Sequence, residues 1–510
     1  MKKIIMGLAA VALLCSVGNA KTLKVGLASG ALSMDPYAHN ETATNSILSN
    51  LFDSLIAFDK DINTHPALAV SWTNPEPTVW LMKLRKGVSF HNGSKFNADD
   101  VVFSFNRVKT WNKSGFKGKV SAIDSVEKID EYTVKFVTKK PYPVFLRKLT
   151  YVNILDKESL EGKDDQWIGL NPIGTGPYSL TSWSKGDHIT MDVNKNHWRG
   201  VAKFDKVVFR LLTNNATRVA AILSNEVHII NRVPVVDVNR VKNSDKLNFF
   251  VQPGLRLIYL QMDQDRDSSP FIKSHDGKNP LKDVRVRKAI YYGINEEAIA
   301  KYVMKGFAQP AAQLSPPAVF GNDPSIKRPA FNPEKAKALL AEAGYPDGFE
   351  IQLDSPNNRY INDAQIAQAV ASSLAKIGIK VKVNATPKST FFKETGKLNT
   401  SFFLIGWASS DGDASSILDG CVHTYNAETG YGRYNRGRYS NTKVDALIEK
   451  SAGIMDPAER LKVLQEAQKI AIVDDQNFIP LHYQVDIYAS SKDIKFETRT
   501  DSRIWAFDIK

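Results

Sequence analysis

Apolar residues recur at helical spacing in some segments and at strand spacing in others. The clearest helix is predicted over residues 363–377. Its apolar stripe contains Ile366, Val370 and Leu374, and a short apolar strand follows at once over residues 379–383. Further helices are predicted over residues 42–52, 101–108, 217–224, 283–293, 296–304, 332–344, 443–451 and 456–473. Further strands are predicted over residues 23–28, 79–84, 189–193, 207–212, 227–230, 349–354, 402–407 and 487–490, with an antiparallel pair over 123–137.

Strands that alternate with helices indicate an α/β protein with largely parallel sheets. The chain has 510 residues, which at roughly 150 residues per domain suggests about three domains. The sequence has no internal repeat and no low-complexity linker. We therefore expect the domains to be joined by crossing strands and not by a flexible tether.

The first twenty residues have the pattern of a cleaved secretory signal. Lys2 and Lys3 precede an apolar stretch over residues 4–17, and small residues follow at 18–20. A buried N-terminal helix or a membrane anchor is the alternative. After cleavage one cysteine remains, Cys421, so no intramolecular disulfide is possible. A large secreted chain of this kind suits the periplasm of a Gram-negative bacterium.

Composition narrows the function mainly by exclusion. Apolar residues make up 43% of the chain, which excludes a disordered protein. The formal net charge of +13 is spread along the chain without a dense basic block, so we expect no nucleic-acid partner. No other apolar run is long enough to span a bilayer.

Motifs of common enzyme classes are absent from the sequence. We find no Gly-x-Ser-x-Gly elbow, no phosphate loop, no dinucleotide fingerprint and no His-Glu-x-x-His pair. The nine histidines lack metal-like spacing. We therefore expect a binding protein that performs no chemistry and has no resident cofactor, although a secreted hydrolase assembled from separate loops remains the alternative of another class.

Polar residues follow the predicted strand over 402–407 directly. Trp407 ends that strand, and Ser409, Ser410, Asp411 and Asp413 come next. In α/β sheets, ligands bind beyond the carboxyl ends of strands. A tryptophan wall beside carboxylates suits an ammonium or a polar amide ligand. A capped turn with a core tryptophan is the alternative reading.

Two arginines are candidate clamps for a ligand carboxylate. Arg359 follows a turn between a strand and the long helix, where a guanidinium can bind a carboxylate through two hydrogen bonds. Arg256 lies within an apolar strand over residues 255–260. A surface salt bridge for Arg359, or an outward strand position for Arg256, is the alternative.

A set of motifs in order along the chain resembles one known family. The set is Trp80-Leu-Met-Lys-Leu-Arg-Lys-Gly-Val-Ser-Phe90, Asn92-Gly93, Phe96, Ala98-Asp99-Asp100-Val101, Phe103-Ser104, Ile173-Gly-Thr-Gly-Pro-Tyr178, Asp283-Val-Arg-Val-Arg-Lys-Ala289, Phe331-Asn-Pro-Glu-Lys-Ala336, Tyr439-Ser-Asn441 and Ile479-Pro-Leu481. Together these motifs resemble the periplasmic solute-binding proteins of peptide/nickel ABC importers, extracellular family 5.

The resemblance implies an α/β fold of two lobes that close on a ligand, with hinge-crossing strands and an extra inserted domain. Lobe I would comprise residues 21–54, 191–265 and 486–510, with the inserted domain, residues 55–190, packed on it. Lobe II would comprise residues 270–485. The hinge is expected near residues 255–263 and 481–487.

The resemblance also implies a set of ligand-binding residues. The family's arginine for the ligand carboxylate matches Arg359. In the dipeptide branch an aspartate that pairs with the ligand ammonium occupies the position of Ser410, whereas Asp411 lies one residue later and Ala414 replaces a proline. The turn Gly30, Ala31 and Leu32 completes the candidate cleft.

The implied function is capture of short peptides by a monomeric periplasmic component, which delivers them to an inner-membrane ABC permease. The runner-up is uptake of Ni(II) as a transported chelate, such as nickel-histidine. In that case His423 and His482 would be the candidate metal ligands. Each of these histidines has an ordinary polar residue as its alternative reading.

Overall fold

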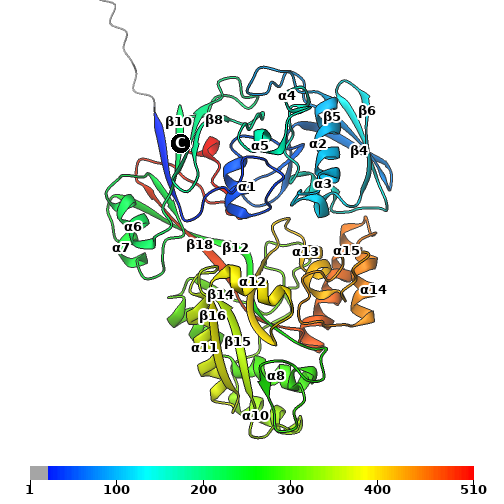
Figure 1. Cartoon of the computed structure of the whole chain (residues 1–510), viewed down its shortest axis with the longest axis vertical. Helices are drawn as coiled ribbons and strands as arrows, with labels where there is room; N and C mark the ends of the chain where they lie inside the picture. Colours follow the sequence, from blue (N-terminus) through cyan, green and yellow to red (C-terminus); the bar gives the residue numbers. More distant parts are fainter. Residues whose placement is uncertain (1–20) are drawn as a thin grey trace, which may run out of the picture.

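The computed structural model describes residues 21–510, and the predicted signal sequence lies outside this range. Figure 1 shows two lobes connected by the long strands β12 (Leu247–Met262) and β18 (Phe478–Ser491). The predicted two-lobed α/β architecture is therefore present. Among the described residues, no helix is long and apolar enough to cross a membrane.

The lobes share a twelve-stranded sheet within residues 21–510, in the order β13-β15-β17-β12-β18-β11-β1-β10-β9-β8, with β14 beside β18 and β16 beside β15. Smaller sheets β4-β5-β7-β6 and β2-β3 accompany it. The strands are β1 Thr22–Leu27, β2 Ile56–Phe58, β3 Thr64–Pro66, β4 Ala69–Glu76, β5 Val79–Leu84, β6 Ile123–Asp130, β7 Thr133–Thr138, β8 Tyr178–Ser184, β9 His188–Val193, β10 Lys206–Leu211, β11 Ile229–Asn231, β13 Ile272–Lys273, β14 Ala308–Pro310, β15 Glu350–Pro356, β16 Lys380–Thr386 and β17 Phe402–Ala408.

The prediction of largely parallel sheets is wrong. Parallel pairing joins β1 to β10 and β11, and β15 to β16 and β17. The strands that connect the lobes pair antiparallel, because β12 runs from one lobe to the other and β18 returns beside it. The strand predicted over residues 487–490 is the end of β18, which the polar residues His482, Gln484 and Asp486 made hard to recognise.

The helices are α1 Thr42–Leu48, α2 Ala98–Thr110, α3 Phe145–Leu149, α4 Lys157–Leu160, α5 Asp165–Ile168, α6 Asn215–Leu223, α7 Val238–Lys242, α8 Val284–Gly293, α9 Glu296–Ala298, α10 Pro333–Glu342, α11 Asp363–Ala375, α12 Lys388–Gly396, α13 Ser415–Ile417, α14 Thr442–Ser451 and α15 Pro457–Gln468. Wider turns over Ile299–Val303 and Lys469–Asp474 continue α9 and α15. Asn332 caps α10 as predicted, by accepting a hydrogen bond from the Lys335 backbone N–H.

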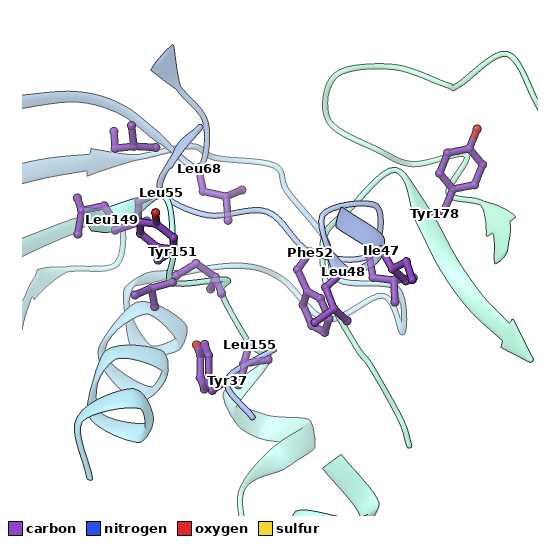
Figure 2. Close-up of a cluster of buried hydrophobic side chains, with 14 of the residues drawn as sticks. Tyr37, Ile47, Leu48, Phe52, Leu55, Leu68, Leu149, Tyr151, Leu155 and Tyr178 are labelled. Atoms are coloured by element: carbon purple, nitrogen blue, oxygen red, sulfur yellow. The ribbon is translucent and has the colours of Figure 1, made fainter. Parts of the chain in front are cut away.

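The hydrophobic core of the upper lobe in Figure 1 extends into the sheet β4-β5-β7-β6. Figure 2 shows Ile47, Leu48 and Phe52 of the N-terminal segment in one cluster with Leu149 and Tyr151. Burying each such side chain contributes roughly 1.5–3 kcal/mol. The segments on either side of residue 55 are thus stabilised by a common core, and α3 is fixed at the face turned toward the lower lobe.

A bulge in β12 lies between the two lobes. The register between β12 and β18 shifts between Pro253 and Leu257. A Cβ atom on Gly254 would lie 2.7 Å from the carbonyl oxygen of Gln484, so this close approach requires glycine. Bulges redirect the side chains of the strand that carries them. Here the bulged segment includes Arg256.

Candidate functional site

A cavity lies between the lobes at this bulge, with about 70 Å³ of space for water-sized groups. Its walls come from the ends of β1 and β11, the first turns of α1, the bulge of β12, the end of β17, the middle of β18 and residues 500–502. Distant parts of the chain therefore meet here, as expected at the carboxyl ends of strands β1 and β11. Water needs roughly 10–15 Å³ of such space per molecule, so the cavity has room for a few small groups.

Two arginines line this cavity, and a third, Arg359, lies close to Arg256 without lining it. Arg232 and Arg256 line it, and the guanidinium carbons of Arg256 and Arg359 lie 5.8 and 5.3 Å from the centre of the Tyr360 ring. All three arginines are half-buried. Within residues 21–510, none of the three guanidinium groups has a protein oxygen within hydrogen-bonding or salt-bridge distance.

The positive charge of these arginines is only partly compensated. Burial lowers the pKa of Arg256 to about 10, and the neighbouring charge of Arg359 adds to this effect. Burial also lowers the pKa of Arg232, against the opposing effect of Asp486. The other cavity aspartate, Asp501, is engaged by Arg499 at 2.8 Å. The cavity is therefore suited to a carboxylate or another anion.

Arg232 was missed in the sequence, although it follows a predicted strand. Its backbone φ is 51°, in the left-handed region. The buried Arg218 holds this turn, because its guanidinium donates to the carbonyl oxygens of Asn231 and Arg232 at 3.0 and 2.7 Å. Left-handed backbone at a non-glycine residue is costly and persists only where neighbours fix it. In the sequence, the polar pair Asn231-Arg232 directly after the predicted strand 227–230 could have indicated a ligand-binding position.

The loop after β17, residues 409–413, has one side chain at the cavity and the others in the protein interior. Ser410 is exposed and lines the cavity. Ser409 is buried, and its backbone N–H donates to the Leu255 carbonyl oxygen at 3.1 Å. Both oxygens of Asp413 accept from Arg460 at 2.7 and 2.8 Å, and both side chains are buried. Asp413 is thus placed in an internal ion pair and not at the cavity.

Asp411 is also buried and turned away from the cavity. Its carboxylate accepts from Lys148 at 2.5 Å, and Lys119 lies 4.0 Å away. Its backbone carbonyl accepts from Arg147 at 2.9 Å. Burial raises the pKa of Asp411, but Lys148 and Lys119 outweigh burial and hold it at about 2.

The other predicted cleft residues are not brought to the cavity lining. Trp407 is half-buried and packs on Tyr434, with ring centres 5.2 Å apart; its indole nitrogen is buried and has no hydrogen-bond partner. In the first turn, Ala31 is buried and Leu32 is 44% exposed. Leu27 and Ser29 line the cavity, just ahead of the predicted Gly30, Ala31 and Leu32.

Neither of the two candidate metal ligands lines the cavity. His482 is fully buried in β18, with its Nδ1 atom 3.0 Å from Glu296. His423 stacks on Tyr431 at 4.3 Å, and its Nε2 atom lies 3.1 Å from Glu449. Among the described residues, no group of three or more His, Cys, Asp or Glu side chains is arranged to hold a metal ion.

Comparisons with known proteins agree with the fold and with the position of the cavity between two lobes. Residues 63–429 match the family described as bacterial extracellular solute-binding proteins, family 5. The chain belongs to this family, as the sequence motifs predicted. The protein is therefore a member of a family that binds solutes.

Individual relatives cover nearly the whole chain. The glutathione-binding protein GsiB of Salmonella choleraesuis is 29% identical over 93% of this chain and 91% of the relative. The Helicobacter pylori periplasmic binding protein DppA, solved with the peptide STSA, is 26% identical with a TM-score of 0.81 over 96% of this chain and 97% of its own. NikZ of Campylobacter jejuni, solved with Ni(L-His), is 25% identical with a TM-score of 0.80 over 96% and 98%.

Proposed function

We propose that this protein captures short peptides between its lobes and delivers them to an inner-membrane ABC permease. The observation that carries the proposal is a group of three half-buried arginines, two lining the interlobe cavity and Arg359 close to Arg256, none of which has a protein acceptor. An unmodified peptide has a carboxylate at its C-terminus, and arginine binds carboxylates through paired, charge-assisted hydrogen bonds.

The geometry supports binding that is coupled to lobe closure. Arg256 lies on a strand that crosses between the lobes, Arg232 follows β11 of the upper lobe, and Arg359 follows β15 of the lower lobe. A carboxylate held by arginines from both sides reduces their mutual repulsion and favours the closed arrangement. Closure then presents one defined surface to a permease, which agrees with the proposed role in import.

The relatives support a peptide-like ligand but do not agree on one. GsiB is described as binding glutathione, DppA was solved with a tetrapeptide, and NikZ was solved with nickel-histidine. Each of these ligands has at least one carboxylate. Nickel-histidine is less well supported for this chain, because His423 and His482 are each bonded to a carboxylate of the protein and are absent from the cavity lining.

The test begins with mass spectrometry of small molecules that copurify with the native protein. Calorimetry then follows with di- to pentapeptides, with Ni²⁺, and with Ni²⁺ plus free histidine. We expect peptides to bind without metal, and His423→Ala and His482→Ala to leave that affinity unchanged. Binding that requires metal and is lost with either histidine variant would replace this proposal with nickel-chelate uptake.

A further inference from the structure

The unpaired arginines at the cavity form two separate positions. Arg256 and Arg359 share one aromatic neighbour, since their guanidinium carbons lie 5.8 and 5.3 Å from the centre of the Tyr360 ring. Arg232 follows β11 of the upper lobe and lines the cavity from there. The cavity therefore offers a pair of arginines at one position and a single arginine at another.

The fold holds Arg232 in place while leaving its side chain without a partner. Its left-handed backbone is fixed by the buried Arg218, which donates to the Arg232 carbonyl oxygen at 2.7 Å. Arg218 also donates to the Leu212 carbonyl oxygen and to the Asn215 side chain, both at 2.8 Å. Left-handed backbone and an unpaired, half-buried charge are both costly, so their combination at one residue points to a ligand contact.

The charges around the cavity leave room for two anionic groups. Two of its lining residues are acidic, Asp486 and Asp501, and Asp501 is engaged by Arg499 at 3.0 and 2.8 Å. Burial lowers the pKa of Arg232, an effect that Asp486 and, more weakly, Glu41 from outside the lining oppose. Asp486 is thus the one lining carboxylate that can offset the three arginines. A single ligand carboxylate leaves positive charge uncompensated, whereas two carboxylates balance it.

The size of the cavity limits how far apart these two carboxylates can be. Its space of about 70 Å³ holds roughly five to seven water-sized groups. This is about the size of the last residue of a peptide. An aspartate or glutamate residue at the C-terminus carries an α-carboxylate and a side-chain carboxylate that only a few carbon atoms separate. The cavity therefore suits two carboxylates on one residue better than two at opposite ends of a peptide.

We propose that Arg232 determines ligand specificity by binding the side-chain carboxylate of an acidic C-terminal residue, whose α-carboxylate is bound by Arg256 and Arg359. This inference rests on the proposed function, from which it takes the interlobe cavity and a peptide ligand. Peptides that end in aspartate or glutamate then bind more tightly than those that end in the corresponding amides.

The test uses pairs of probes that differ in one carboxylate. The pairs are Ala-Glu with Ala-Gln, Glu-Ala with Gln-Ala, and glutarate with its monoamide, each measured by calorimetry. For the wild type we expect Ala-Glu to bind about tenfold or more tightly than Ala-Gln, and glutarate to exceed its monoamide similarly, because each amide loses a charge-assisted pair with arginine. We expect Glu-Ala and Gln-Ala to bind within about threefold of each other.

Three variants assign the preference to Arg232. Arg232→Asn removes the guanidinium, and asparagine tolerates left-handed backbone, so the preference for Ala-Glu should fall to within about threefold. Arg232→Lys keeps the charge without the paired hydrogen bonds, and we expect an intermediate preference. Arg240→Gln is the matched control: it removes the same charge from an exposed position on α7 and should leave the preference unchanged.

The outcomes separate this inference from the proposed function. If peptides bind but Ala-Glu has no advantage over Ala-Gln, or Glu-Ala has the same advantage over Gln-Ala, the inference is wrong and the peptide function stands. An unchanged preference in folded Arg232→Asn, or in Arg232→Lys if the first variant does not fold, also overturns it, as does an equal loss in Arg240→Gln. If only glutarate binds and its preference depends on Arg232, the peptide function fails and the role of Arg232 stands. No binding of any probe contradicts both.

Discussion

The arginine group at the cavity and the loop over residues 409–413 both lie between the lobes. They differ in that the charges of the arginines are unpaired, whereas those of the loop aspartates are paired within the protein. Arg232, Arg256 and Arg359 are half-buried without a protein acceptor. In the loop, Asp413 is paired with Arg460 and Asp411 with Lys148. Burying a charge is costly unless it is paired. Unpaired charges therefore indicate where a ligand belongs, and paired charges indicate where the protein holds itself together.

The largest expected effect comes from breaking a paired charge inside one lobe. Asp413→Ala removes two of the hydrogen bonds of the buried Arg460 guanidinium and its only carboxylate partner among the described residues, leaving the bond to the Ser451 carbonyl oxygen. Removing one partner of such a pair costs about 3–5 kcal/mol, so we expect a loss of that size in the free energy of unfolding. Denaturant unfolding measures it. A loss below about 1 kcal/mol would contradict the structural role of Asp413.

Removing an unpaired charge is expected to act on affinity and not on stability. Arg359→Ala should weaken a carboxylate-bearing ligand by about 2–4 kcal/mol in calorimetry. The ligand-free protein should be equally stable or slightly more stable, because Arg359 repels Arg256. A clear loss of stability with unchanged affinity would mean that Arg359, like Asp413, stabilises the fold and does not bind the ligand.

The third prediction concerns Asp419, a buried carboxyl group, and the pH dependence of the free energy of unfolding. Burial raises its pKa from 3.8 to about 7, so the folded state favours the protonated acid. Its contribution to stability is complete below about pH 4 and is lost as the pH rises through 7. Relative to wild type, Asp419→Asn should gain about 1–3 kcal/mol of unfolding free energy at pH 8 and little at pH 4. Unfolding curves at both pH values measure this, and a gain independent of pH would contradict the assignment.

The smallest effect concerns Trp407, which lies beside the loop and packs on Tyr434. Because the next residues, Ala408 and Ser410, line the cavity, we expect lobe closure to change the surroundings of its indole group. Ligand binding should therefore shift the intrinsic fluorescence, and Trp407→Phe should remove most of that shift. A shift that persists in the variant would come from another of the eight tryptophans of the chain.

The sequence predicted the fold more completely than the site. Helix 363–377 has a regular apolar stripe and matches α11 closely, and family motifs indicated the two lobes. Strand direction was predicted wrongly because β12 and β18 pair across more than 200 intervening residues, which no local pattern records. The partners of Asp411 and Asp413 were equally hidden, since Lys148 and Arg460 lie far away in the chain. Arg256 was recognised, but the bulge that turns it toward the cavity depends on the same long-range pairing.

The most direct test of the account combines Arg256→Gln with a change in the ligand. The affinity of a peptide with a free C-terminal carboxylate is compared with that of its C-terminal amide, on the wild type and on the variant. We expect amidation to weaken binding strongly to the wild type and little to Arg256→Gln, with a coupling free energy of at least about 1.5 kcal/mol. A coupling within about 0.5 kcal/mol of zero would mean that Arg256 does not bind the ligand carboxylate, and the central claim would be wrong.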